Sequence, residues 1–253
     1  MKKKFLALGT CAFALALDLV ACGDDNSSNG PTNDHDFDYG EFTDARDGQV
    51  YKTVTIGTQT WMAENLNYAY TGVKFSYSGY TSDSTSWCYD NDPSKCATYG
   101  RLYTWAAAMD SAGIVDPSGA GKGCGFDVYC DAASVRGVCP SGWHLPSEAE
   151  WSDLYQAVGG TSSAGQKLKA NTSLWNGKTG TDDYGFSVLP AGYRDYDGGF
   201  RLRGDYANFW SSPESEYSSS NAWSQYFNRN VNVGQGYGYK YYGFSVRCLK
   251  DSP

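Results

Sequence analysis

The cysteines constrain the fold of this 253-residue chain more than any other feature of its sequence. Six of the eight lie beyond residue 85. An even number of cysteines in an exported chain is typical of a disulfide framework. Among the possible pairings, the spacing favours two short loops in Gly-, Asp- and Ser-rich sequence, Cys88–Cys96 and Cys124–Cys130, and one long loop, Cys139–Cys248.

The long loop would tie the middle of the chain to its last strand. A loop of about 110 residues stabilises the folded state by about 4.7 kcal/mol in the chain-entropy model, and strain reduces that value. Zinc is the alternative use of these cysteines. However, no Cys-x2–4-Cys pair is present, and His144 has no second histidine near it in the sequence. We therefore predict disulfides and no metal site.

The N-terminus predicts export. Three lysines at residues 2–4 precede an apolar stretch, residues 5–17, which is too short to span a bilayer and typical of a signal peptide. The sequence LVAC at residues 19–22 then resembles a bacterial lipobox, so we predict a lipoprotein signal peptide over residues 1–21 and lipidation of Cys22. The alternative is an ordinary secretory signal cut nearby, with Cys22 incidental. The lipoprotein reading predicts an exported, membrane-anchored protein of the outer membrane or cell surface.

The charge balance excludes one class of partner. Without residues 1–21 the chain has 17 basic and 27 acidic residues, a net charge of −10. Nucleic-acid binding requires Lys and Arg clustered on one face, so we predict no nucleic-acid partner. Apart from the signal peptide, no apolar run approaches membrane-spanning length, and we expect membrane contact through the lipid anchor only.

The remainder of the chain divides into two parts. Residues 22–44 are rich in Asp, Asn, Ser and Gly and nearly free of aliphatic side chains, which predicts a flexible acidic tether. Residues 45–250 are uniform in composition, with many glycines and aromatics, and we predict one folded domain there.

Patterns at the start of this domain predict its first elements. Alternation of side chains predicts a strand over residues 50–56, a turn at Gly57 and a second strand through Trp61. Residues 67–96 are interpreted as loop. Apolar residues at helical spacing predict a buried helix over 99–110. A Gly-rich loop is expected over 111–138.

The segment GVCPSGWHLPSEAEW, residues 137–151, places His144 close to two glutamates and raises the question of a reaction centre. Ser147 followed three residues later by Glu150 is a capping box, in which each side chain bonds a free amide of the first helical turn. Apolar residues then recur at helical spacing up to Gly159. We interpret the segment as a helix start and not as a catalytic site.

Beyond residue 185 the sequence predicts short antiparallel strands, in the segments GFSVLPAGYR, GGFRLRG, ANFWSS, AWSQYFN and YYGFSVRCL. Seventeen aromatic residues lie between Tyr184 and Phe244, which is more than one strand face needs for packing.

Several stretches together resemble a known bacterial family, the Fibrobacter succinogenes major paralogous domain. They cover nearly all of residues 47–250 and are DGQVYKTVTIGTQTWMAENLNY, WCYDNDPSKCATYGRLYTWAAAM, GVCPSGWHLPSEAEW, DDYGFSVLPAGYRDYDGGF, FWSS and YGFSVRC. The resemblance implies an exported protein or surface lipoprotein, and it implies no particular reaction.

More distantly, WHLPSEAEW, FWSS and YGFSVRC resemble C-type-lectin-like and formylglycine-generating-enzyme-like folds. This resemblance implies an α+β domain with small antiparallel sheets, two or three helices and long loops, stapled by disulfides. It also implies that the first strand, residues 50–56, lies beside the last, residues 244–249, an arrangement that suits the Cys139–Cys248 bridge.

An enzyme is the less favoured function. The formylglycine-generating relatives bind copper with a cysteine pair, whereas each cysteine here has a disulfide partner available. Neither a G-x-S-x-G motif nor a phosphate loop is present, and pairs of carboxylates among Asp182, Asp183, Asp195 and Asp197 have no supporting context. Calcium-lectin motifs are also missing, and Asp195–Gly199 is interpreted as a hairpin turn. We predict no catalytic residues and no cofactor.

A non-catalytic binding module is the favoured function. Flat aromatic faces interleaved with Asn, Asp and Gln suit sugars, and the segment GQGYGYKYYG is interpreted as an exposed loop. The candidate ligand-binding residues are Trp175, Tyr193, Trp223, Tyr237, Tyr239 and Tyr241, whereas Trp210 is expected in the core. The partner is predicted to be a polysaccharide. A surface protein is the alternative. Exposed aromatics that line a groove would favour the polysaccharide, and exposed aromatics on a flat patch would favour the protein.

Overall fold

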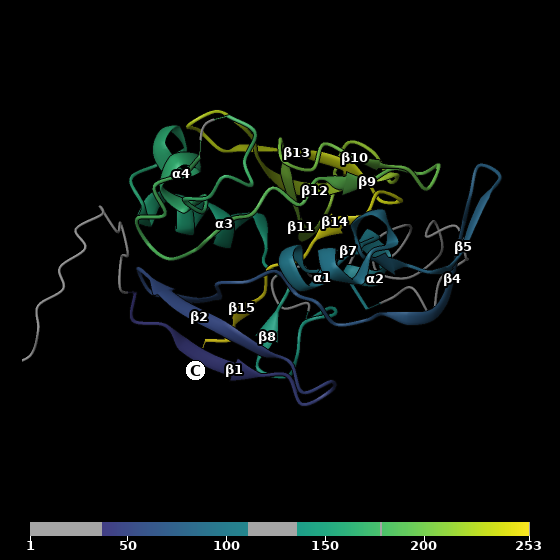
Figure 1. Ribbon diagram of the computed structural model, residues 1–253, viewed down its shortest axis with the longest axis horizontal. Helices are drawn as coiled ribbons and strands as arrows, with labels where there is room; N and C mark the ends of the chain where they lie inside the picture. Colours follow the sequence, from purple (N-terminus) through teal and green to yellow (C-terminus); the bar gives the residue numbers. More distant parts are fainter. Residues whose placement is uncertain (1–36, 111–135, 178, 253) are drawn as a thin grey trace, which may run out of the picture. The chain divides into compact units, whose positions relative to one another are not determined.

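The computed structural model describes residues 37–110, 136–177 and 179–252 (Figure 1). The first of its two main sheets is antiparallel throughout and has the order β1-β2-β3-β15-β8. Its strands are β1 (Gly40–Thr43), β2 (Val50–Ile56), β3 (Gln59–Met62), β15 (Leu249–Lys250) and β8 (Trp143–His144).

The second main sheet has the order β13-β12-β11-β14-β7-β6 and is antiparallel except where β11 meets β14. Its strands are β13 (Gly234–Tyr239), β12 (Asn221–Phe227), β11 (Ala207–Glu214), β14 (Phe244–Ser245), β7 (Leu102–Tyr103) and β6 (Ser86–Trp87).

Two hairpins and a few short helices complete the described part of the chain. The hairpins are β4 (Thr71–Tyr77) with β5 (Tyr80–Ser84), and β9 (Tyr193–Arg194) with β10 (Phe200–Arg201). The helices are η1 (Tyr89–Asn91), α1 (Pro93–Tyr99), α2 (Trp105–Ala108), α3 (Glu148–Ala157) and α4 (Thr161–Leu168). Separate small sheets with few helices define an α+β architecture. No helix of the described residues is long and apolar enough to cross a membrane.

Local patterns predicted several of these elements correctly. The strands over residues 50–56 and 59–62 are present, with Gly57 in the turn at a φ of 62°. Helix α3 begins after Ser147, whose hydroxyl accepts a hydrogen bond from the Glu150 amide, while the Glu150 side chain accepts one from the Ser147 amide. The capping box is therefore confirmed. The turn predicted at residues 195–199 joins β9 to β10.

The interpretation of residues 67–96 as loop was wrong. This range contains the β4–β5 hairpin, β6, η1 and most of α1. The two residues that turn the hairpin, Ser78 and Gly79, have φ values of 49° and 85°. Two residues of positive φ form the turn that matches the twist of paired strands. The Tyr77-Ser78-Gly79-Tyr80 sequence was thus a hairpin signal inside polar composition.

Other predicted elements differ from the structure in their length, type or neighbours. The buried helix expected over residues 99–110 is only α2, preceded by β7, although its side chains are buried as predicted. The stretch GQGYGY is not a loop but strand β13. The first strand does not lie beside the last, because β3 lies between β2 and β15.

The folded part begins before residue 45, where the tether was expected to end. Strand β1 pairs with β2, and Asp44 is fully buried. The Asp44 carboxylate accepts hydrogen bonds from Arg46, including one of 2.7 Å from Nη2. Burial raises the pKa of Asp44, but its bonds to Arg46 outweigh burial and lower it overall. The rest of the expected tether, residues 22–36, lies outside the described residues.

Two of the predicted disulfides are confirmed, Cys88–Cys96 and Cys139–Cys248. The second joins two fully buried residues within a core that includes Tyr103, Trp105 and Trp210. A second core packs α3 and α4 against strands of both sheets. The third expected pair, Cys124 and Cys130, lies outside the described residues.

Candidate functional site

Strand β13 separates its side chains by size between its two faces. Its sequence is GQGYGY, and successive side chains of a strand point to opposite faces. A Cβ at Gly234 would collide with the Tyr226 ring, and one at Gly238 with the rings of Phe244 and Trp210. Because these rings fill the space on the inner face, glycine is required at positions 234 and 238, and the tyrosines occupy the outer face.

The first part of the outer face is built around Tyr237. This side chain is 38% exposed and lies opposite Trp223 of β12, with the ring centroids 4.3 Å apart. Tyr217, which is 78% exposed, meets Tyr237 edge to face at 5.7 Å. The half-buried Trp223 therefore supports two more exposed rings.

The second part begins with Tyr239, 45% exposed and two residues further along the same face of β13. Its ring stacks on Tyr241 at 5.1 Å and 8°, and Tyr241 stacks on Tyr77 at 4.1 Å. Tyr196, 41% exposed, meets both Tyr77 and Tyr241 edge to face. The two parts are continuous, because residues i and i+2 of a strand are only about 6–7 Å apart.

We call this group the tyrosine surface. It consists of Tyr77, Tyr196, Tyr217, Tyr237, Tyr239 and Tyr241.

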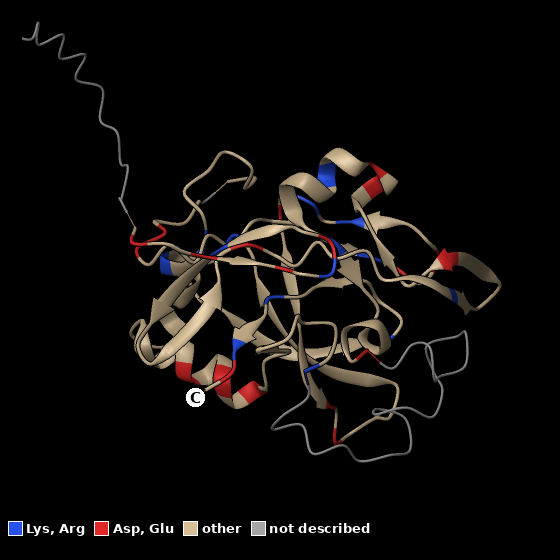
Figure 2. Ribbon diagram, turned by 90° about the horizontal axis from the view of Figure 1, so that it is seen from below, with Lys and Arg blue, Asp and Glu red and all other residues tan. Residues whose placement is uncertain are grey.

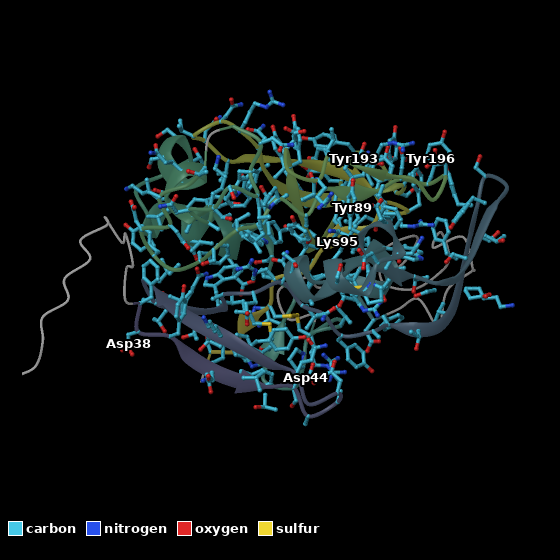
Figure 3. All side chains as sticks on the ribbon, viewed as in Figure 1. Asp38, Asp44, Tyr89, Lys95, Tyr193 and Tyr196 are labelled. Atoms are coloured by element: carbon cyan, nitrogen blue, oxygen red, sulfur yellow. A yellow bond between two sulfur atoms is a disulfide. The ribbon has the colours of Figure 1, made fainter. Side chains whose placement is uncertain are left out.

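A buried arginine holds the two hairpins that contribute to the tyrosine surface. Arg194 of β9 is 1% exposed, and its guanidinium carbon lies 3.7 Å from the centre of the Trp87 ring and 4.8 Å from that of Tyr80. Phe75 of β4 closes the third side. Cation–π contacts of this kind join β4–β5 to β9, and Tyr196 follows two residues later. Figure 3 shows Tyr196 at this end of the domain.

Two hydroxyl groups of the tyrosine surface, those of Tyr237 and Tyr241, have a pKa raised above the ordinary value, chiefly by burial. Burial and the neighbouring Tyr77 raise the pKa of Tyr241. Burial, Asp195 and nearby tyrosines raise the pKa of the adjoining Tyr242 to about 12. A protonated tyrosine hydroxyl both donates and accepts a hydrogen bond, which suits a ligand rich in hydroxyls or amides.

The structure separates the six aromatic candidates. Tyr237 and Tyr239 are exposed, and the half-buried Tyr241 joins them in the tyrosine surface. Trp223 and Tyr193 are half-buried behind it; Tyr193 packs on Tyr242 at 5.4 Å. Trp175 is not part of this surface. It is 3% exposed, and its indole nitrogen donates to the Val188 carbonyl within the second core. Trp210 is fully buried, as expected.

Sequence reasoning missed three members of the tyrosine surface, Tyr77, Tyr196 and Tyr217. Tyr77 lies in the segment interpreted as loop, and Tyr196 in a turn between Asp195 and Asp197. Alternation in β4 could have indicated that Tyr77 and Phe75 share one face. Nothing local indicates that Tyr77 meets Tyr241, because 164 positions of the sequence separate them.

His144 has a structural role in the described part of the chain. Its Nε2 lies 2.8 Å from a Glu150 carboxylate oxygen and its Nδ1 lies 2.7 Å from one of Asp251. Figure 2 shows the acidic residues of α3 beside this C-terminal end. Burial lowers the pKa of His144, but the hydrogen bonds to Glu150 and Asp251 outweigh it and raise the pKa overall. With both ring nitrogens engaged, the imidazole ties the last strand to α3.

Over the described ranges no group of three His, Cys, Asp or Glu side chains is arranged to hold a metal ion.

The fold and this site define a class: a disulfide-linked α+β domain with an exposed aromatic surface. A family model, the Fibrobacter succinogenes major domain, matches residues 54–250. The chain therefore belongs to the Fibrobacter succinogenes major domain family, which confirms the resemblance drawn from the sequence. No curated protein matches the chain, and no solved structure matches it.

Proposed function

We propose that the protein is a non-catalytic binding module of the cell surface that recognises polysaccharide through the tyrosine surface. One observation carries the proposal. Eight large hydrophobic side chains of the described residues are exposed, and four of them are tyrosines of this one surface: Tyr196, Tyr217, Tyr237 and Tyr239. Large apolar groups that cluster on a surface mark interaction sites, whereas scattered ones need no explanation.

Polysaccharide suits the chemistry of these side chains. A sugar ring offers an apolar C–H face and a rim of hydroxyl groups. Tyrosine offers a flat apolar ring and a protonated hydroxyl, and it loses little conformational entropy on binding. Gln235 lies on the same outer face of β13 as Tyr237 and supplies an amide for hydrogen bonds to hydroxyl groups.

A protein partner is the second candidate, and one observation favours it. Three clefts of the described residues are lined by side chains other than those of the tyrosine surface. A ring stack such as Tyr77, Tyr241 and Tyr239 also turns ring edges and hydroxyls outward, because the faces contact one another. Tyrosine-rich flat surfaces are common in protein recognition.

The proposal also covers the cellular location of the protein and the type of fold to which it belongs. The lipobox at LVAC supports an exported lipoprotein anchored through Cys22, in the outer membrane or at the cell surface. The capping box of α3 and the pairing of β15 with β3 and β8 support a fold of the C-type-lectin-like or formylglycine-generating-enzyme-like type. Disulfide pairing of Cys88 with Cys96 and of Cys139 with Cys248 means that none of these four cysteines is free to bind copper.

A pull-down tests the proposal. The oxidised protein is incubated with insoluble and soluble polysaccharides, with and without EDTA, and the retained fraction is measured. We expect retention that survives EDTA and falls at least tenfold in the double variant Tyr237→Ala, Tyr239→Ala. Leu174→Ala is the matched control, because Leu174 is as exposed as Tyr237 and lies outside the tyrosine surface.

Two results would contradict this expectation. Loss of retention in EDTA would show that a metal ion is needed. Failure to retain on any polysaccharide would favour the protein partner. That candidate is then tested by cross-linking the anchored protein on cells, comparing the wild type with the double variant.

A further inference from the structure

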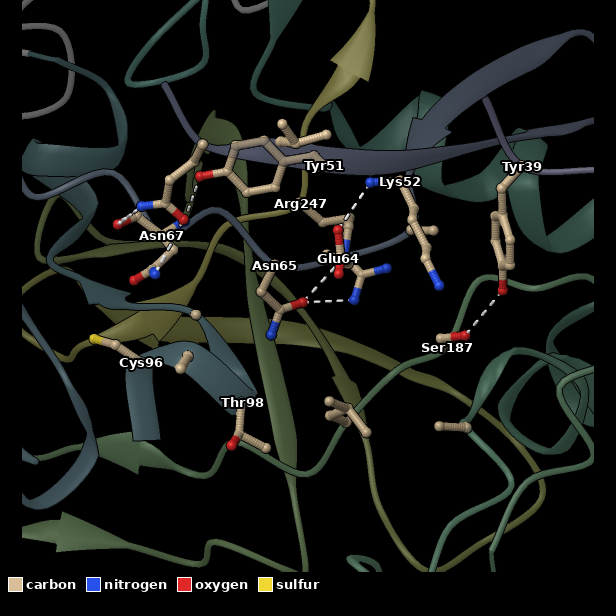
Figure 4. A pocket seen from close by; sticks show the side chains of 17 residues that line it. Tyr39, Tyr51, Lys52, Glu64, Asn65, Asn67, Cys96, Thr98, Ser187 and Arg247 are labelled. Atoms are coloured by element: carbon tan, nitrogen blue, oxygen red, sulfur yellow. Dashed lines mark hydrogen bonds between the residues drawn. The ribbon is translucent and has the colours of Figure 1, made fainter. Parts of the chain in front are cut away.

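A polar cleft of about 560 Å³ lies apart from the tyrosine surface, on the other main sheet (Figure 4). One wall is formed by β2 and by residues 63–67 after β3, and the other by the end of α1 and residues 187–189. Ten of its seventeen lining side chains carry a polar group. The size is that of a site for a small molecule.

The mouth of the cleft carries two opposite charges. Lys52 and Glu64 are both exposed, and the Lys52 amide donates to the Glu64 carboxylate at 2.8 Å. The Lys52 ammonium lies 5.1 Å from the centre of the Tyr39 ring. No carboxylate of the described residues lies within ion-pair distance of this ammonium. It is therefore available to a ligand.

The floor of the cleft contains a buried cation. Arg247 is 1% exposed and donates to the Asn65 side-chain oxygen at 2.6 Å and to the Phe186 carbonyl at 2.6 Å. All its hydrogen-bond acceptors in the described part of the chain are uncharged. Burial lowers the pKa of Arg247 to about 9, so the guanidinium remains charged at neutral pH. Its positive charge is thus not neutralised by direct contact with a carboxylate.

One acceptor of the cleft is unused. The side-chain oxygen of Asn67 is buried and has no hydrogen-bond partner among the described residues, although its amide nitrogen donates to Gln49 at 3.1 Å. An unsatisfied buried acceptor is costly, and a hydroxyl donor beside it would remove that cost. Figure 4 shows Asn67 at the same end of the cleft as Cys96 and Thr98.

We propose that this cleft is a second binding site, for a small hydroxyl-rich ligand that carries a single carboxylate, of the chemical class of a uronic acid. Among the lining residues, Lys52 and Arg247 against Glu64 leave an excess of one positive charge. Asp182, which is bonded to Ser187 behind the lining, offsets part of the charge of Arg247, so the exposed Lys52 ammonium is the group that pairs with one carboxylate. The Asn67 side-chain oxygen accepts from a ligand hydroxyl, and so do the hydroxyl oxygens of Thr98 and Ser187, whose own protons are donated within the protein. This inference does not depend on the function proposed for the tyrosine surface.

Titration with defined probes tests the site. Isothermal titration calorimetry and amide NMR are used with glucuronate, glucose and acetate as separate probes of the oxidised protein. We expect glucuronate to bind at least tenfold more tightly than the other two and to shift the Asn67 side-chain amide signals. Equal affinity for glucose would remove the role of the charge. Equal affinity for acetate would show that the hydroxyl groups of the ligand contribute nothing. Either result would overturn the proposal.

Variants separate the cleft from the rest of the molecule. Lys52→Gln should weaken glucuronate binding about tenfold, which corresponds to about 1.4 kcal/mol. Lys74→Gln is the control, because Lys74 is an exposed lysine of β4 outside the cleft. The Tyr237→Ala, Tyr239→Ala variant should bind glucuronate as the wild type does. Unchanged binding in Lys52→Gln, or loss of binding in the tyrosine variant, would show that glucuronate binds elsewhere.

Discussion

Strands β15 and β13 lie near the end of the chain but have different surroundings. Strand β15 lies between β3 and β8, and Cys248 immediately before it is bonded to Cys139. Among the described strands, β13 has a neighbour on one side only, and every second side chain of it is exposed. The comparison shows one strand that is held on both sides and another that presents every second side chain to solvent. Variants should therefore affect stability and binding separately.

The largest effect is expected from the long disulfide. Replacing Cys139 and Cys248 by serine should lower the free energy of unfolding by about 5 kcal/mol, because the bond closes a loop of 109 residues. The same change at Cys88 and Cys96, which are 8 residues apart, should cost about 2.5 kcal/mol in that model. Urea unfolding of both variants measures the difference. Equal costs would show that loop length does not determine the stabilisation.

A smaller effect is expected from a single methyl group on the inner face of β13. Gly238→Ala should cost about 1–3 kcal/mol, since its Cβ would collide with Phe244 and approach Trp210. Gly236→Ala is the matched control in the same strand, because the nearest side-chain atom to its Cβ would be 3.8 Å away. Thermal unfolding of both variants tests the prediction. A comparable loss in the two variants would show that the collision at position 238 is not the cause, because alanine is otherwise more favourable than glycine in a strand.

Stability should depend on pH through His144. The pKa of His144 is raised in the folded state. Its contribution to the free energy of unfolding is therefore fully present below the ordinary pKa near 6.5, and it is lost as pH rises through the pKa of the folded state. Burial raises the pKa of Glu150, but its hydrogen bonds to His144 and Ser147 outweigh burial and lower the pKa overall. The contribution of Glu150 to stability is therefore lost as pH falls through that lower value. The two groups titrate as a coupled pair.

Unfolding measured from pH 5 to 9 checks this expectation. The wild type should lose stability across the upper part of that range, and His144→Gln should remove most of the loss. A profile that is unchanged in His144→Gln would show that another group is responsible.

The smallest effect on stability is expected at the exposed tyrosines. Tyr237→Ala and Tyr239→Ala should each cost no more than about 0.5–1 kcal/mol, because the rings are exposed and contact other surface rings. Chemical unfolding measures this, and it should be compared with the tenfold loss of polysaccharide retention expected for the double variant. A large loss of stability would show that these rings are structural.

What the sequence predicted correctly is local. The capping box of α3 requires only Ser147 and Glu150, three residues apart, and the β2–β3 turn only Gly57. Strand β13 was missed because three of its six residues are glycines, a composition typical of loops. Glycine is needed because the rings of Tyr226 and Phe244, which belong to other strands of the sheet, occupy the space where a side chain would lie. No local sequence pattern shows this contact.

The same limit applies to the candidate site. Trp175 and Tyr237 look alike as aromatics in polar surroundings, yet one is buried against Val188 and the other exposed. Their burial depends on which elements pack above them. The cleft could not be predicted either, because Lys52, Asn67 and Arg247 come from distant parts of the chain.

The alternation in β13 also affects how this domain can vary. Since packing restricts positions 234 and 238, while 235, 237 and 239 point outward, mutations at the outer positions are largely independent of folding. Copies of the domain could exchange these three side chains and acquire different ligands while the scaffold stays intact. Duplicated genes would then need few substitutions to diverge in specificity, and a laboratory library randomised at these three codons would consist mainly of folded proteins.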